Sequence, residues 1–300
     1  GLYYLRLLIM IAYSLSVYKP KFTFNIPENF KEILSYSIYI LLAGSAASLL
    51  IDIDKYMIPQ KEAISQTAYY AVAVFIATVV EIPGRAMFQI LNPMVAKAVN
   101  RKDFNNLNEL YQKSSSNLLI ICGFFFLLIN LNIVSFYELM NNQFYADAIW
   151  VVLIISFAKL IQMSFGCGPA ILATSSFYKI TLPFSISMAI SVYFLNDYLI
   201  DLHGINGAAI STLIVLLLFT ILKVLYINFK LKIHPYSYNT IKIILVISLV
   251  YFIFDFIQLK FYPLFNIVLK SALISSVYIF LVYFLKLSDT INKTIDSLIK

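Results

Sequence analysis

The stretch that decides the fold is residues 66–93, which read QTAYYAVAVFIATVVEIPGRAMFQILNP. It is apolar and longer than the about 20 residues that a helix needs to cross a bilayer. Glu81, Pro83, Gly84 and Arg85 interrupt its middle. An arginine at the bilayer centre costs about 2.5–3.5 kcal/mol on insertion scales, so such residues usually face a water-filled cavity or a partner. The stretch therefore predicts a kinked membrane helix with a functional polar centre.

The composition of the whole chain supports this interpretation. Hydrophobic residues make up 61% of the 300 positions and charged residues 12%, with a mean hydropathy of +0.85, whereas about 25% of the residues of soluble domains are charged. The net charge is +7, and the basic residues lie between apolar runs. This placement is typical of loops that orient membrane spans and speaks against nucleic-acid binding. We expect an all-α integral membrane protein with no nucleic-acid partner.

Apolar runs of membrane length recur along the chain and are separated by short polar connectors. About nine transmembrane helices are predicted, at residues 2–18, 33–52, 66–92, 117–137, 148–175, 180–196, 205–228, 241–257 and 262–285.

The basic residues orient these spans. Most lie in alternate connectors on one side, and only Lys55, Lys61 and Lys260 lie in those on the other. Because cytoplasmic loops carry the excess of lysine and arginine, the first side is predicted to be cytoplasmic. The tail at 286–300 is then cytoplasmic as well.

Two connectors suggest more than a turn. Residues 19–30 contain two prolines and follow a complete span, as an inter-lobe linker would. Residues 94–115 have an apolar helical face surrounded by charges, which predicts an amphipathic helix in the cytoplasmic interface or a solvated linker. Since the chain begins at Gly1 inside a span, we expect it to be the C-terminal part of a longer protein.

The first candidate site lies in the opening stretch. Glu81 and Arg85 are four residues apart and share a helical face, so they are expected either to form a structural ion pair or to serve a site. In the second interpretation, Arg85 lines a cavity with Gln89 and Asn92 and binds an anionic headgroup, because its planar fork suits phosphate oxygens. Glu81 would then be a candidate for ion coupling.

The second candidate is Lys159, which lies about eleven residues, or roughly 17 Å, into its predicted span. Ser156, Lys159 and Gln162 recur every three residues and form one polar stripe. Lys159 and Gln162 are predicted to bind substrate. The alternative is a lysine bonded to backbone carbonyls that a nearby helix break leaves free.

Glycines and prolines predict where the helices bend. Pro83 lacks an amide proton and should kink the helix, and Gly84 allows a neighbour to approach closely. Gly166, Gly168 and Pro169 predict a flexible or broken stretch of the kind found at transporter binding sites.

Sequence features of enzymes are missing. Both histidines, His203 and His234, lie in predicted loops, and Cys122 and Cys167 lie in separate spans. The sequence thus offers no metal cluster, nucleotide-binding motif or catalytic residue, and we expect no metal, no cofactor and no enzymatic activity.

Four stretches resemble the polysaccharide-exporter branch of the multidrug/oligosaccharidyl-lipid/polysaccharide superfamily, the bacterial lipid-linked oligosaccharide (O-antigen) flippases. They are LIDIDKYM at 50–57, YYAVA at 69–73, the helix end NP at 92–93 and GINGAA at 204–209. Each motif is weak by itself, and their order and spacing carry the resemblance.

The resemblance implies a fold and a function. It implies two six-helix lobes around a central cavity, with 1–18 the last helix of the N-terminal lobe, 31–228 the C-terminal lobe and 240–285 an added helix pair. The N-terminal lobe itself is missing from the sequence. The cargo would be an undecaprenyl-pyrophosphate-linked oligosaccharide, flipped to the outer leaflet of the bacterial inner membrane by alternating access and coupled to a cation gradient. Arg85 and Lys159 would suit its diphosphate.

Three other functions stay open. A cation-coupled multidrug exporter of the same superfamily would favour buried carboxylates, and Glu81 is the clearest one within a predicted span. A membrane enzyme of glycan assembly, such as a polymerase, would need a large outer loop, whereas the outer connectors are short. A scaffold subunit that transports nothing is the fourth interpretation.

Overall fold

The computed structural model describes residues 2–18, 26–140, 148–257 and 261–299, and the regular elements of these ranges are all helical. The chain divides into two compact units, Gly1–Ile38 and Tyr39–Lys300. The first unit contains α1 (Leu2–Tyr18) and the beginning of α2 (Phe30–Lys61). Residues 19–25 of the predicted linker lie outside the described residues.

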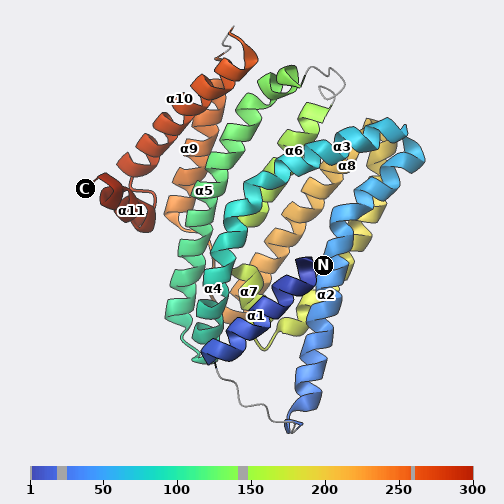
Figure 1. The fold of residues 1–300 in the computed structure, drawn as a ribbon, viewed down its shortest axis with the longest axis vertical. Helices are drawn as coiled ribbons and strands as arrows, with labels where there is room; N and C mark the ends of the chain where they lie inside the picture. The colour runs from blue at the N-terminus through green and yellow to red at the C-terminus, as the bar shows by residue number, and fades with distance from the viewer. Residues whose placement is uncertain (1, 19–25, 141–147, 258–260, 300) are drawn as a thin grey trace. The chain divides into compact units, whose positions relative to one another are not determined.

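The second unit begins within α2, and Figure 1 shows its helices as a bundle of long rods. Its further elements are α3 (Ile64–Thr78), the 3₁₀ turn η1 (Val79–Glu81), α4 (Ile82–Asn100), α5 (Phe104–Leu139), α6 (Ile149–Ser164), α7 (Gly168–Thr174), the 3₁₀ turn η3 (Tyr178–Ile180), α8 (Thr181–Leu231), α9 (Tyr238–Asp255), α10 (Pro263–Phe284) and α11 (Asp289–Ile299).

Length and composition make this a multi-pass membrane protein of the all-α class. Among the described residues, five helical segments are long and apolar enough to cross a bilayer, or six if the bent pair α6 and α7 counts as one span. The segment that contains α8 is 54 residues long. It reverses at Gly204, whose backbone angles are φ 56° and ψ −137°. The count of about nine spans and the lobe architecture stay predictions.

The predicted amphipathic helix at 94–115 is wrong. Residues 94–100 complete α4, a short turn follows, and α5 begins at Phe104 and continues without a break to Leu139. Leu107 and Tyr111 are fully buried, in a cluster that includes Phe165 and Ile171. The apolar face that the sequence assigns to the lipid interface therefore packs inside the protein.

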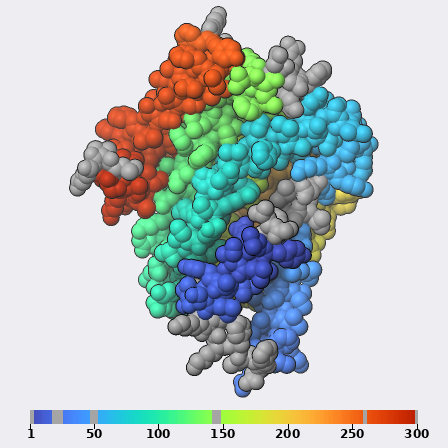
Figure 2. Space-filling view, in the orientation of Figure 1, coloured from blue at the N-terminus to red at the C-terminus, as the bar shows by residue number. Residues whose placement is uncertain are grey.

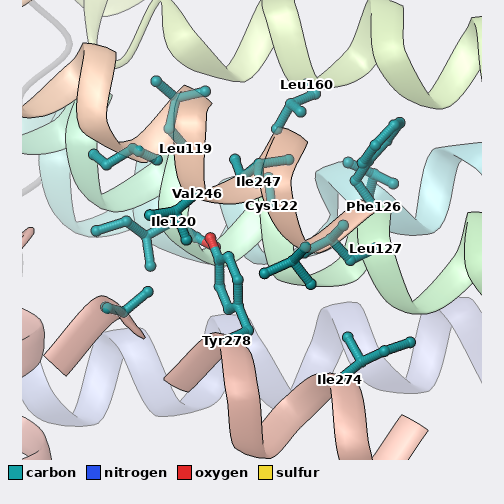
Figure 3. Packing of buried hydrophobic residues seen from close by; sticks show 14 of the residues in the cluster. Leu119, Ile120, Cys122, Phe126, Leu127, Leu160, Val246, Ile247, Ile274 and Tyr278 are labelled. Carbon is teal, nitrogen blue, oxygen red and sulfur yellow. The ribbon is translucent and has the colours of Figure 1, made fainter. Parts of the chain in front are cut away.

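Helix α5 forms the centre of the largest hydrophobic cluster, which also draws residues from α6, α9 and α10. Figure 3 shows Tyr278 of α10 reaching into this cluster between Ile120 and Leu127, and its hydroxyl donates a hydrogen bond to the carbonyl oxygen of Ile120 at 2.9 Å. A Cβ atom at Gly123 would lie 2.4 Å from Ile247 Cδ1, so α9 packs closely on α5. The final helix pair thus shares its core with α5.

The predicted tail at 286–300 contains a folded element, α11. In Figure 2, α10 and α11 form a continuous orange and red surface beside the green of α5. Ser288 donates a hydrogen bond of 2.5 Å to Asn117 of α5. The Tyr283 hydroxyl donates one of 2.7 Å to Asp296, so α11 is fixed against the end of α10.

Candidate functional site

Glu81 lies at the end of the 3₁₀ turn that separates α3 from α4, near the middle of residues 66–93. Its two carboxylate oxygens bind different cations. Oε1 accepts from Arg85 Nη2 at 2.5 Å, and Oε2 lies 2.9 Å from Lys159 Nζ of α6. One carboxylate thus pairs with two cations, and the trio keeps one net positive charge.

The two cations differ in exposure. The side chain of Lys159 is 12% exposed, as is that of Glu81, whereas that of Arg85 is 69% exposed. Gln89 and Asn92 are also exposed, and their spacing of four and seven residues from Arg85 places all three on one face of α4. Arg85, Gln89 and Asn92 therefore form an exposed polar face, and Glu81 connects this face to buried Lys159.

Lys159 and Gln162 line a cavity of about 220 Å³, which we call the Lys159 cavity. Its other polar lining residues are Asp54, Tyr70, Thr78, Ser185, Thr212 and Lys223, and its apolar ones are Val74, Ile155, Met188, Val192, Val215 and Leu216. Ser156, the third residue of the predicted polar stripe, instead bonds Asn130 of α5. The structure therefore divides the predicted binding residues between this cavity and the exposed face of α4.

Asp54 lines this cavity, although it falls in the predicted outer connector between the spans 33–52 and 66–92. It is only 3% exposed. Its Oδ1 accepts from Asn196 Nδ2 at 2.6 Å, and its Oδ2 accepts from the Thr212 hydroxyl at 3.0 Å and from the Tyr70 hydroxyl. Met57, one helical turn further on, is also buried, but this burial is visible only in the structure.

These contacts define what Asp54 can do chemically. A buried carboxylate is costly unless its charge is compensated. Three uncharged donors hold Asp54 in one position and supply no positive charge. A proton or a small monovalent cation at Asp54 would remove that cost.

Lys223 is a second charged lining residue that is not among the binding residues predicted from the sequence. It lies within α8 and lines the Lys159 cavity, with Nζ 3.4 Å from the sulfur of Met188. A thioether is a weak acceptor. Among the described residues, no carboxylate lies within ion-pair distance of Lys223, so the cavity holds a cation without an acidic partner.

Two of the predicted kink residues lie at helix starts. Pro83 lies in the first turn of α4, directly after the 3₁₀ turn, and Pro169 lies in the first turn of α7. A Cβ atom at Gly84 would come within 2.5 Å of the sulfur of Met163, so α6 approaches α4 closely there. The axes of α6 and α7 differ by 53°.

The break between α6 and α7 is tightly packed. Gly166 has φ +56°, and a Cβ atom there would lie 2.6 Å from Ser114 Oγ. Ser114 accepts a hydrogen bond from the Cys167 amide at 2.9 Å, and Ser115 donates one to the Ser164 carbonyl at 2.6 Å. Ser114 and Ser115 of α5 thus bond one backbone amide and one backbone carbonyl at the break.

The described residues contain no group of three or more histidine, cysteine or acidic side chains that could hold a metal ion. A search of protein-family models, of curated proteins and of solved structures found no match to this chain.

Proposed function

We propose that this chain is part of a membrane flippase that moves an undecaprenyl-pyrophosphate-linked oligosaccharide from the cytoplasmic to the outer leaflet by alternating access. The observation that supports this proposal is the Lys159 cavity, which lies within a bundle of apolar helices and is lined by two lysines. The resemblance of residues 50–57, 69–73, 92–93 and 204–209 to polysaccharide exporters points to the same cargo.

The charges favour an anionic cargo. Lys159 shares Glu81 with Arg85, so the trio retains one positive charge, and Lys223 adds another. Among the described residues, Asp54 is the one acidic side chain in the lining of the cavity. A diphosphate would replace Glu81 as the partner of Lys159 and find a second cation in Lys223, while Arg85 would bind from the exposed face of α4.

We assign ion coupling to Asp54 first and to Glu81 second. Protonation of Glu81 would leave two cations without a partner, whereas protonation of Asp54, or cation binding there, removes the charge of a buried carboxylate whose hydrogen-bond donors are all uncharged. Because Asp54 and Lys159 line the same cavity, occupancy at Asp54 would change the electrostatic potential that the cargo meets.

Replacing Lys159, one of the two lysines that line the cavity, tests this function. In the full-length protein, reconstituted with a fluorescent lipid-linked oligosaccharide, Lys159→Ala should slow translocation about tenfold or more, since a charged hydrogen bond contributes about 1.5–3 kcal/mol. Lys97→Ala is the matched control, because Lys97 is an exposed cation of α4 outside the cavity. An unchanged rate in Lys159→Ala, with normal expression, would contradict the proposal.

Asp54 favours a second candidate, a cation-coupled multidrug exporter of the same superfamily. Its buried carboxylate is the kind of group that a cationic drug would seek. The same vesicles can be loaded with ethidium. Ethidium transport that requires Asp54, without transport of the lipid-linked oligosaccharide, would favour the exporter.

A further inference from the structure

A second pocket lies at the opposite end of α3 from Glu81, where three segments meet. It has a volume of about 520 Å³, and we call it the Trp150 pocket. Its lining residues are Glu62, Gln66, Trp150, His203, Gly204, Ile205 and Asn206. They come from the α2–α3 connection, the start of α6 and the reversal of α8.

Two features fix the walls of this pocket. Gly204 adopts φ +56°, and a Cβ atom there would lie 3.2 Å from Glu62 Oε1, so the glycine allows the carboxylate to approach the reversal. Lys61 forms ion pairs with Asp197 at 2.7 Å and Asp201 at 2.9 Å, which connect the end of α2 to α8. Hydrogen bonds to Asp197 and Asp201 raise the pKa of Lys61 above its ordinary value, because the two carboxylates stabilise the charged lysine.

The chemistry of the lining suits a carbohydrate. Trp150 is the only tryptophan in this sequence, and it is 62% exposed. An indole offers a flat apolar face, and the pyranose ring of a sugar has a matching face of C–H groups. Glu62 and Gln66 supply acceptors and a donor for the hydroxyl groups at the ring edge.

The charge of the residues that line the Trp150 pocket favours a neutral sugar over an acidic one. Among the described residues, no lysine or arginine lines the Trp150 pocket, and Glu62 is its one acidic side chain. Glu62 would repel a uronic acid or a phosphate. A neutral sugar meets no such repulsion.

We propose that the Trp150 pocket binds a neutral pyranose unit of a glycan, with the sugar ring stacked on Trp150 and its hydroxyl groups bonded to Glu62 and Gln66. The assignment rests on the proposed function in taking a glycan as the cargo. It adds a second site, separate from the Lys159 cavity, that holds the sugar part of that cargo.

The test is calorimetric titration of the full-length protein in lipid nanodiscs with maltotetraose, tetra-N-acetylchitotetraose and tetragalacturonate. At least one neutral oligosaccharide should bind saturably, and about tenfold more tightly than tetragalacturonate. Trp150→Ala and Glu62→Gln should each weaken that binding about tenfold. Their matched controls, Tyr198→Ala and Glu138→Gln, alter exposed residues outside the pocket and should leave it unchanged. No saturable binding of either neutral sugar, or equal binding by Trp150→Ala, would overturn the assignment.

Fluorescence provides an independent readout, because an exposed tryptophan can also lie in the lipid interface. The emission of Trp150, isolated as the difference from Trp150→Phe, should shift on addition of the neutral sugar. Quenching by brominated lipids without any response to sugar would overturn the proposal. Lys159→Ala should retain sugar binding while translocation falls, so loss of binding and loss of transport report separately on the two proposals.

Discussion

At the residue scale, Asp54 shows how burial changes the role of a charged side chain. Asp54→Ala removes the acceptor of Tyr70, Asn196 and Thr212. An unsatisfied buried donor costs about 1–3 kcal/mol, so we expect a loss of stability of about 2–5 kcal/mol, seen as a lower melting temperature in detergent. Asp54→Asn, which keeps the shape and removes the charge, should melt closer to the unmodified protein and lose the ion dependence of transport.

The control for this prediction is Asp201→Ala. Asp201 is 62% exposed and shares Lys61 with Asp197, so its loss should change stability by less than about 1 kcal/mol. If Asp54→Ala melts as Asp201→Ala does, the three hydrogen bonds to Asp54 contribute little.

Glu81 and Lys159 allow a double-mutant cycle that separates a structural ion pair from a binding site. Glu81→Gln leaves Lys159 without an acidic partner at a site where both side chains are 12% exposed, and it should destabilise the protein by about 2 kcal/mol or more. Lys159→Met leaves Glu81 paired with exposed Arg85 and should destabilise the protein less. The double variant should recover much of this loss, because neither charge remains.

Transport then decides between the two roles. If Lys159 binds the cargo, the double variant should regain its melting temperature and stay inactive. Recovery of translocation together with stability would assign Lys159 a structural role alone.

The sequence could not reveal the depth of Asp54 and Lys223. Both lie near the ends of apolar runs, where interfacial charges are common, and a single position carries no periodicity. Asp54 bonds Asn196 and Thr212, which are 142 and 158 residues away in the sequence. Lys223 contacts Met188, which is 35 residues away. Lys159 was accessible to prediction because it lies in the middle of a span.

At the element scale, helix breaks were the easiest feature to predict. Pro83 lies just after the 3₁₀ turn η1 and Gly166 lies in the break between α6 and α7, because proline lacks a donor and glycine tolerates positive φ. Gly204, where α8 reverses, is not among the predicted bend residues. The fate of residues 94–115 was harder to predict. Their pattern fixes which face is apolar, and an apolar face packs equally well against lipid or against Phe165.

Gly166→Ala tests whether the break between α6 and α7 is fixed. The substitution places a side chain at φ +56° and within 2.6 Å of Ser114 Oγ. We expect a loss of about 2 kcal/mol or more, measured by thermal unfolding. Gly44→Ala is the matched control: it lies within α2, no atom of the described side chains lies within 4 Å of its Cβ position, and the change should stabilise the helix by about 0.5–1 kcal/mol. Equal melting temperatures of the Gly166→Ala and Gly44→Ala variants would show that packing does not fix the break between α6 and α7.

At the scale of the whole molecule, the distribution of lysine and arginine predicts that the C-terminus is cytoplasmic. Ile64 and Phe229 are 80% and 79% exposed, and the predicted orientation places them on opposite sides of the membrane. In intact cells, an impermeant maleimide should label Ile64→Cys and spare Phe229→Cys. Both native cysteines, Cys122 and Cys167, are buried, so background labelling should be low. The reverse pattern would invert the orientation and exclude the proposed direction of transport.

The attachment of α10 and α11 to α5 has a consequence for biosynthesis. Asn117 meets Ser288 across 171 residues, and Asn132 bonds Ser271 across 139. At translation rates of about 5–20 residues per second, α5 enters the bilayer roughly ten to thirty seconds before Ser288 has been synthesised. Throughout that interval Asn117 and Asn132 lack their partners on the final helices, while Asn132 keeps its bond within α5 to the Leu128 carbonyl at 2.8 Å. A chain whose synthesis stops between α9 and α10 would lack Ser271 and Ser288. Its asparagine amides would then lack these partners, and quality-control proteases could recognise it by them.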